Sequence, residues 1–208
     1  MGLYIGSDKY KPMVGGAKAS FIVETVPYDA EIEFLSGASG AYINTGFVPT
    51  QNDFKLVVDA YKNTTGDNML LYVYNSETSN YFNLNWYATT AYFRYLGTQK
   101  TSSAAYGTHT FQMGSPCKID NTNVNITGTK SFVGNTEPLN LFAIVKPTGK
   151  SSYFKGRFYS MQGYYGSTLV LDYIPVRVGQ VGYIYDKVSK KLMGNSGTGS
   201  FGIGNDKN

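Results

Sequence analysis

The chain has 208 residues, of which 42% are hydrophobic and 15% are charged. A disordered chain needs low hydrophobicity and high charge, so this composition excludes disorder. The formal net charge is +4, but the 18 basic residues are scattered along the chain, which argues against a nucleic-acid partner.

Cysteine and histidine occur once each, as Cys117 and His109. A single cysteine excludes an intrachain disulfide, and a structural zinc site needs three or four thiolate or imidazole ligands. No apolar run approaches the roughly 18 residues of a membrane span, and no apolar signal core follows Met1. We therefore expect neither a membrane partner nor a secretory signal.

The first thirty residues differ from the rest of the chain. Two short strand-like runs, residues 3–6 and 20–26, lie on either side of Gly15 and Gly16, and the segment is too short to form its own core. Residues 1–30 therefore add a hairpin to the main domain or form an arm that docks on another molecule. The residues that would carry such an attachment are Leu3, Tyr4, Ile5, Tyr10, Phe21 and Ile22.

Residues 31–208 show strand periodicity and almost no helical periodicity. In FKLVVDAYK (54–62), apolar residues alternate with polar ones, and in YFNLNWYA (81–88) Phe82, Leu84 and Trp86 alternate with Asn83, Asn85 and Tyr87. Further runs cover 92–96, 108–113, 139–146, 153–162, 168–178 and 182–186, and turns are expected at 63–68, 147–150 and 163–166. This pattern predicts one all-β domain, a two-sheet antiparallel sandwich or jelly roll.

Proline cannot donate a hydrogen bond to a strand ladder. Pro175 therefore predicts a sheet edge or a strand end within the run 168–178.

Several motifs are better explained by structure than by catalysis. GTGSFG (197–202) matches a dinucleotide fingerprint, but too few residues follow for the required helix, so a glycine-rich turn is expected. Glu31 and Glu33 do not continue into the carboxylate array of a glycosidase. His109 is expected at a strand start, capping or solvated, and Cys117 as a small packing residue.

Calcium remains an open but unsupported alternative, and no cofactor is predicted. Asp67 with Asn68, or Asp120 with Asn121 and Asn123, supply oxygen ligands of the kind calcium takes. The same residue types favour turns for their own backbone hydrogen bonds, and we take the turn interpretation.

Ordered pieces of residues 31–208 resemble the concanavalin A-like, laminin-G-type sandwich of bacteriophage structural proteins and bacterial surface proteins. GAYINTG (40–46) is similar to its opening element, and HTFQM (109–113) with KIDNTNVNITG (118–128) to its central hairpin. Residues 139–178 resemble its paired central strands, and GYIYDKVSKKLMGNSGTGSFGIG (182–204) its closing element. The leading LYIGSDKYKPMVGG resembles short tags of phage head and tail proteins.

The resemblance implies a non-enzymatic virion protein, either a head decoration, a fibre or a tail-associated adhesin. Residues 1–30 would attach it to other virion proteins on the particle surface, and residues 31–208 would form a homo-oligomeric sandwich. The alternative is a lectin-like carbohydrate-binding module that contacts a host-surface glycan. Its candidate stacking aromatics are Trp86, Tyr87, Tyr92, Tyr164 and Tyr165, although Trp86 fits a core position equally well.

Overall fold

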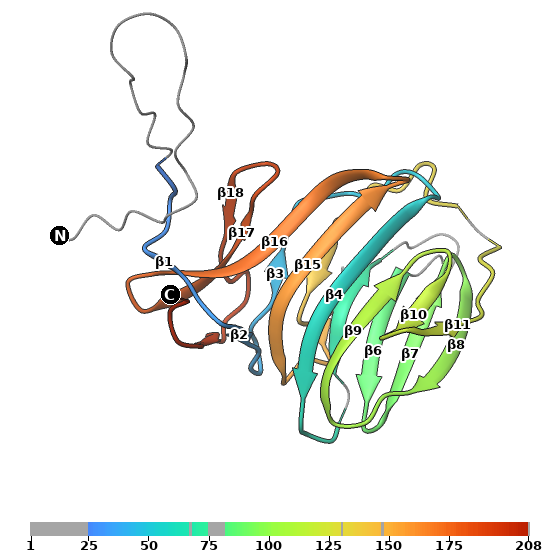
Figure 1. Ribbon diagram of the computed structural model, residues 1–208, viewed down its shortest axis with the longest axis horizontal. Helices are drawn as coiled ribbons and strands as arrows, with labels where there is room; N and C mark the ends of the chain where they lie inside the picture. The colour runs from blue at the N-terminus through green and yellow to red at the C-terminus, as the bar shows by residue number, and fades with distance from the viewer. Residues whose placement is uncertain (1–24, 67, 75–81, 130, 147, 208) are drawn as a thin grey trace, which may run out of the picture.

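The computed structural model describes residues 25–66, 68–74, 82–129, 131–146 and 148–207. Two antiparallel β-sheets face each other (Figure 1), and the described residues contain no helix. The predicted all-β class and antiparallel two-sheet sandwich are confirmed. No helix long and apolar enough to cross a bilayer occurs in the part of the chain that the structure describes.

The larger sheet is built around the long strands β4 (Phe54–Lys62), β15 (Arg157–Tyr165) and β16 (Thr168–Val178). One side is completed by β9 (Gly107–Met113), β10 (Cys117–Ile119) and β11 (Thr122–Val124). The other side is completed by β17 (Val181–Asp186) and β18 (Lys191–Met193), with the short strands β1 (Ala30–Glu31), β2 (Leu35–Ser36) and β19 (Gly202–Ile203).

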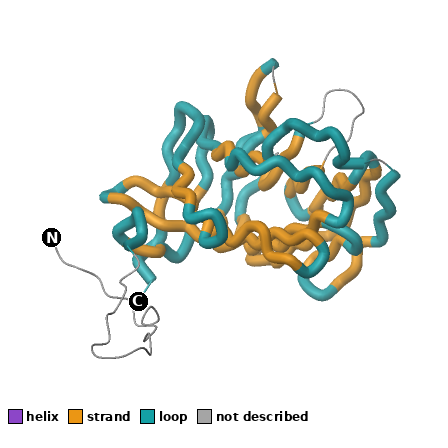
Figure 2. The backbone as a smooth tube through the Cα atoms, turned by 90° about the horizontal axis from the view of Figure 1, so that it is seen from above, coloured by secondary structure: helices purple, strands orange, loops and turns teal. Residues whose placement is uncertain are grey.

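The smaller sheet has six strands. Their order across the sheet is β3 (Ile43–Asn44), β12 (Leu139–Leu141), β5 (Met69–Val73), β6 (Phe82–Tyr87), β7 (Thr90–Tyr95) and β8 (Thr98–Ser103). A separate hairpin, β13 (Ile144–Lys146) with β14 (Gly149–Ser151), projects from the end of β12. The view along the sheets in Figure 2 shows strands in layers joined by long loops.

The apolar alternation places the core between the two sheets. Phe54 of β4 contacts Phe82 of β6, with ring centroids 5.7 Å apart. Trp86 of β6 and Phe93 of β7 both contact Phe111 of β9. Because side chains point alternately to opposite faces of a strand, the residues between these aromatics face outward.

The segments 40–46 and 182–204, far apart in the sequence, lie against each other in space. The Asn195 side chain accepts hydrogen bonds from the Tyr42 and Gly197 amides at 3.1 and 2.9 Å. A side chain at Gly197 would collide with the Gly40 carbonyl, because the two backbones touch there. GTGSFG is therefore the glycine-rich loop predicted, and β19 rather than a helix begins at its last residue, Gly202.

Several predicted elements were wrong in detail, among them the strand run 139–146 and the turn 163–166. The run 139–146 is broken between β12 and β13 by Phe142, whose φ is 72°. The turn predicted at 163–166 begins later, because Gly163, Tyr164 and Tyr165 belong to β15. Gly163 is needed for close packing instead, since a Cβ there would lie 2.9 Å from Leu171 and 3.0 Å from Leu56.

Pro175 lies inside β16, neither at an edge nor at a strand end as predicted. Along one side of β16, β15 pairs as far as Tyr173 and β1 pairs from Val176. Pro175 falls at this changeover, where its carbonyl accepts a hydrogen bond from the Ile32 amide at 3.1 Å. The missing N–H faces the same side, so no strand-to-strand ladder bond is lost.

Candidate functional site

The outer face of the six-stranded sheet carries a row of polar side chains. Tyr72, Asn83, Arg94 and Gln99 are successive cross-strand partners on β5, β6, β7 and β8. Their neighbours along the strands, such as Leu84 and the aromatic Phe93, are fully buried in the core. Directly opposed side chains lie close enough to act together, so the register itself assembles this row.

A second row runs beside the first. Met69, Asn85 and Tyr92 are cross-strand partners on β5, β6 and β7, and Tyr87 lies two residues beyond Asn85 on the same face. The Asn85 carboxamide accepts a hydrogen bond from the Asn68 amide at 3.3 Å, which fixes its orientation. Both rows stand on paired strands, although the pairing of β5 with β6 shifts register between Met69 and Leu71.

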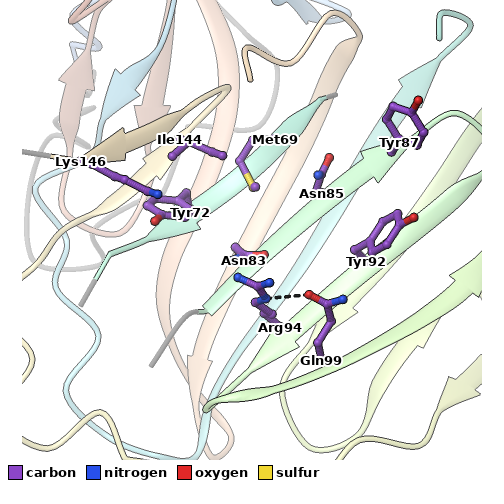
Figure 3. A pocket seen from close by; sticks show the side chains of 10 residues that line it. All are labelled: Met69, Tyr72, Asn83, Asn85, Tyr87, Tyr92, Arg94, Gln99, Ile144 and Lys146. Carbon is purple, nitrogen blue, oxygen red and sulfur yellow. Dashed lines mark hydrogen bonds between the residues drawn. The ribbon is translucent and has the colours of Figure 1, made fainter. Parts of the chain in front are cut away.

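These rows form a groove of about 620 Å³ together with the β13–β14 hairpin. Figure 3 shows Ile144 and Lys146 of β13 on one side, and Tyr87 and Tyr92 on the other. The hairpin is joined to the sheet where the Met69 amide donates to the Ser152 carbonyl at 2.9 Å. The groove thus has a polar floor, an aromatic side and a wall formed by the hairpin.

Two of the five predicted aromatics lie in this groove. Tyr87 is 46% exposed, and Tyr92 is half-buried beside it. Trp86 has to be removed from the candidate stacking aromatics. It is completely buried, and its Nε1 donates a hydrogen bond to the Ala104 carbonyl at 3.0 Å. Its place in the apolar face of β6 assigns it to the core.

The other two predicted aromatics belong to the larger sheet and do not line the groove. The Tyr165 ring packs on Phe54 at 5.4 Å, and its hydroxyl accepts a hydrogen bond from the Thr50 amide. The Tyr164 hydroxyl donates to Gln162 at 2.8 Å. Both rings are half-buried and already engaged in contacts within the sheet, so they do not form part of one site with Tyr87 and Tyr92.

The charged side chains in the described lining of the groove are cations. Arg94 and Lys146 are its charged lining residues, and no described lining residue is acidic. Arg94 Nε donates to the Gln99 side-chain oxygen at 2.7 Å, which holds the guanidinium along the floor. The sequence did not predict a binding role for Asn83, Asn85, Arg94 and Gln99. The alternation of the run 82–87 does place Asn83 and Asn85 on its polar face, which was the available signal for these two.

His109 and Asp120 form a pair on the other sheet. His109 Nδ1 lies 2.8 Å from Asp120 Oδ2, and Nε2 lies 3.0 Å from the Ala105 carbonyl oxygen. His109 lies near the start of β9, as expected, but it is not solvated, because the ring packs against Trp86 and only 16% of the side chain is exposed. Both ring nitrogens face protein acceptors, which leaves neither to activate a nucleophile.

Asp120 occupies the turn between β10 and β11, with a φ of 52°. Its Oδ1 accepts a hydrogen bond from the Thr110 amide at 3.0 Å while Oδ2 faces His109, so both oxygens have protein partners. This supports the turn interpretation over a calcium ligand. Asp67 lies outside the described residues, and those residues hold no cluster of three or more His, Cys, Asp or Glu that fits a metal.

The remaining candidates have structural surroundings. Cys117 is fully buried, as predicted, and this burial raises the pKa of its thiol to about 11. Glu31 accepts a hydrogen bond from Tyr28, whereas Glu33 accepts one from Asn205. Neither carboxylate lines the groove.

The predicted attachment residues Leu3, Tyr4, Ile5, Tyr10, Phe21 and Ile22 lie outside the described residues. No protein-family model matches the chain, and no curated protein matches it.

Proposed function

We propose that this protein is a non-catalytic carbohydrate-binding domain and that the groove on the outer face of its six-stranded sheet holds the glycan. The observation that carries the proposal is the joining of Tyr87 and Tyr92 with Asn83, Asn85 and Gln99 in one groove. A sugar ring has an apolar face and a rim of hydroxyl groups. The aromatic rings suit the first, and the carboxamides, which both donate and accept, suit the second.

The size and rigidity of the groove support this proposal. Its volume of about 620 Å³ falls within the roughly 300–1,000 Å³ of small-molecule sites. The polar side chains stand on paired strands rather than on loops, so little ordering entropy is lost when a ligand binds. Hydrolysis of a glycosidic bond needs a pair of carboxyl groups across the substrate, and the described lining of the groove holds none.

Placement on a virion surface is a further part of the proposal. The resemblance of residues 31–208 to phage structural proteins supports it, as does the tag-like leading segment. On a particle, a sandwich with an open sugar-binding face would act as an adhesin toward a host glycan.

A titration of the full chain with a panel of neutral and acidic oligosaccharides tests the binding proposal. We expect chemical-shift changes confined to β5–β8 and the β13–β14 hairpin. Tyr92→Ala should raise the Kd at least tenfold, ~1.4 kcal/mol. The matched control is Tyr106→Ala, because Tyr106 is 42% exposed and does not line the groove. Absence of binding across the panel at millimolar sugar would overturn the proposal.

A further inference from the structure

We infer that the glycan contains an N-acetylated amino sugar, and that its acetamido group lies in the corner of the groove between β5, β6 and the β13–β14 hairpin. This inference rests on the proposed function and specifies its ligand class. In this arrangement the acetamido methyl contacts Ile144 and Met69, and the acetamido carbonyl accepts a hydrogen bond from Asn85.

One corner of the groove is apolar. Met69 and Ile144 are the aliphatic residues of its described lining, and they come from different elements, β5 and β13. Figure 3 shows Met69 between Ile144 and Asn85. Met69 is only 4% exposed, whereas Ile144 is half-buried, so Ile144 offers the larger apolar surface to a ligand. Such a corner suits a methyl group better than a hydroxyl, which would lose its hydrogen bonds to water there.

Asn85 places a hydrogen-bond donor beside this corner. It is the cross-strand partner of Met69, so the carboxamide and the thioether are neighbours on the same face. Its Oδ1 accepts a hydrogen bond from the backbone amide of Asn68, and only the oxygen end of a carboxamide can accept one. The Nδ2 end is thereby oriented, and none of the described residues accepts a hydrogen bond from it.

The spacing across the sheet matches one amino sugar with its acetamido group. Met69, Asn85 and Tyr92 are successive cross-strand partners on β5, β6 and β7, and neighbouring strands lie about 4.8 Å apart. A sugar ring that stacks on Tyr92 therefore extends its acetamido group over Asn85, with the methyl toward Met69 and Ile144. A hydroxyl at the same ring position is too short to reach the apolar corner.

A methionine in contact with an isoleucine is by itself ordinary packing between a hairpin and a sheet. Two features distinguish this corner. It opens into the groove on the outer face, where its neighbours in the row are Asn85 and Tyr92, and it adjoins an oriented donor. A deoxy sugar also carries a methyl group, but it lacks the carbonyl that Asn85 would bind, so the donor favours the acetamido group.

Matched neutral ligands on the full chain test the inference. Chitotetraose is compared with cellotetraose, and methyl N-acetylgalactosaminide with the same anomer of methyl galactoside, by titration calorimetry. Within each pair the rings differ only in whether they carry an acetamido group or a hydroxyl. We expect at least one acetamido member to bind at least about tenfold more tightly than its hydroxyl counterpart. Nuclear Overhauser effects should connect its acetyl methyl to Ile144 and Met69.

Asn85→Asp is the sharpest variant, because it keeps an oxygen for the Asn68 amide and replaces the donor with an acceptor. This variant and Ile144→Ala should each bring the ratio of the two affinities toward one. One control is Val145→Ala, since Val145 is half-buried on the same strand but alternates to the opposite face and does not line the groove. The other is Asn63→Asp, which adds the same charge at an exposed residue outside the groove.

Circular dichroism and a melting curve show whether each variant is folded, and the comparison of ligands on the natural chain needs no variant. Equal affinity for the acetamido and hydroxyl members would overturn the inference while leaving sugar binding intact. An unchanged ratio in Asn85→Asp, or an equal reduction in Val145→Ala, would do the same. No binding to any sugar would overturn both proposals.

Discussion

At the scale of single residues, Asp120 shows how a turn carboxylate is tied into the larger sheet. Burial alone raises the pKa of this carboxyl, but hydrogen bonds from the His109 ring and the Thr110 amide outweigh it and lower the pKa below its ordinary value. The ionised form is therefore favoured in the folded state. The stability that this provides is fully present above about pH 4, the unfolded pKa, and is lost as the pH falls through the lower folded pKa.

Asp120→Asn should remove this pH-dependent contribution and keep the turn, because asparagine tolerates the left-handed backbone that Asp120 adopts. Above about pH 4 we expect the variant to be less stable than the natural protein by under about 1 kcal/mol, since the side chain is 52% exposed and water screens the pair. Below that pH the difference should shrink. Urea unfolding between about pH 2 and 6 measures it, and a difference that grows on acidification would contradict the assignment.

The same scale explains why Trp86 takes the core position, one of the two alternatives that the sequence left open for it. The alternating run 82–87 assigns Phe82, Leu84 and Trp86 to one face and Tyr87 to the other. Because Phe82 and Leu84 are core residues, that periodicity alone excludes Trp86 from an outer site. The aromatic side chain suggested that Trp86 contacts a ligand, whereas its position in the alternation of β6 determined that it is buried.

At the scale of elements, one face of β6 contributes to the stability of the core and the other to the proposed binding groove. Leu84 is fully buried, and Leu84→Ala should destabilise the fold by about 2–5 kcal/mol through lost burial and an unfilled cavity. Asn85→Ala, one residue further, should cost only about 1 kcal/mol, because it removes the hydrogen bond from the Asn68 amide. Binding of the glycan should fall in the Asn85 variant, and the Leu84 variant should keep its affinity while it remains folded.

Chemical denaturation and titration on the same two proteins check this separation. Val58→Ala on β4 is the control for the loss of core burial in Leu84→Ala, because Val58 is equally buried in the facing sheet. If Asn85→Ala destabilised the protein as strongly as Leu84→Ala, the division of β6 into a core face and a binding face would be wrong.

Element boundaries were predicted where the local pattern determines them. The runs 54–62 and 168–178 coincide with β4 and β16, since each alternates or continues without interruption between clear turns. The break after β12 was missed because LNLFAIVK (139–146) is mostly apolar and contains neither glycine nor proline. Phe142 turns the chain there to pack among Phe154, Phe158 and Phe201, a set of contacts that is distant in sequence.

The groove was beyond prediction for a related reason. It depends on the register that aligns β5 to β8. It also depends on the β13–β14 hairpin, which lies over the sheet because the chain turns after β12. Alternation places Tyr87 and Tyr92 on an outer face, but only the paired strands bring Arg94 and Gln99 beside them.

At the scale of the whole molecule, the start of the described chain is bound to the far end of the larger sheet. The Tyr28 ring lies 5.0 Å from that of Tyr185, and the Asp29 amide donates to the Arg177 carbonyl at 2.9 Å. The Asp29 carboxylate in turn accepts a hydrogen bond from the Gly179 amide at 2.7 Å. Residues 28–31 therefore contribute to the sandwich, and a test of the predicted attachment segment has to leave them in place.

Deletion of residues 2–24 should abolish self-association and incorporation into particles while the sandwich stays folded. We expect the full chain to be a multimer and the shortened chain a monomer by light scattering, with a melting temperature changed by less than about 2 °C, which is under ~1 kcal/mol for a chain of this size. Deletion of residues 2–30 is the contrasting variant, because it also removes the contacts of Tyr28 and Asp29. It should cost at least about 2 kcal/mol through several lost hydrogen bonds and a lost ring contact. A shortened chain lacking residues 2–24 that remained multimeric would place self-association in the sandwich itself, and its normal incorporation into particles would refute the attachment role.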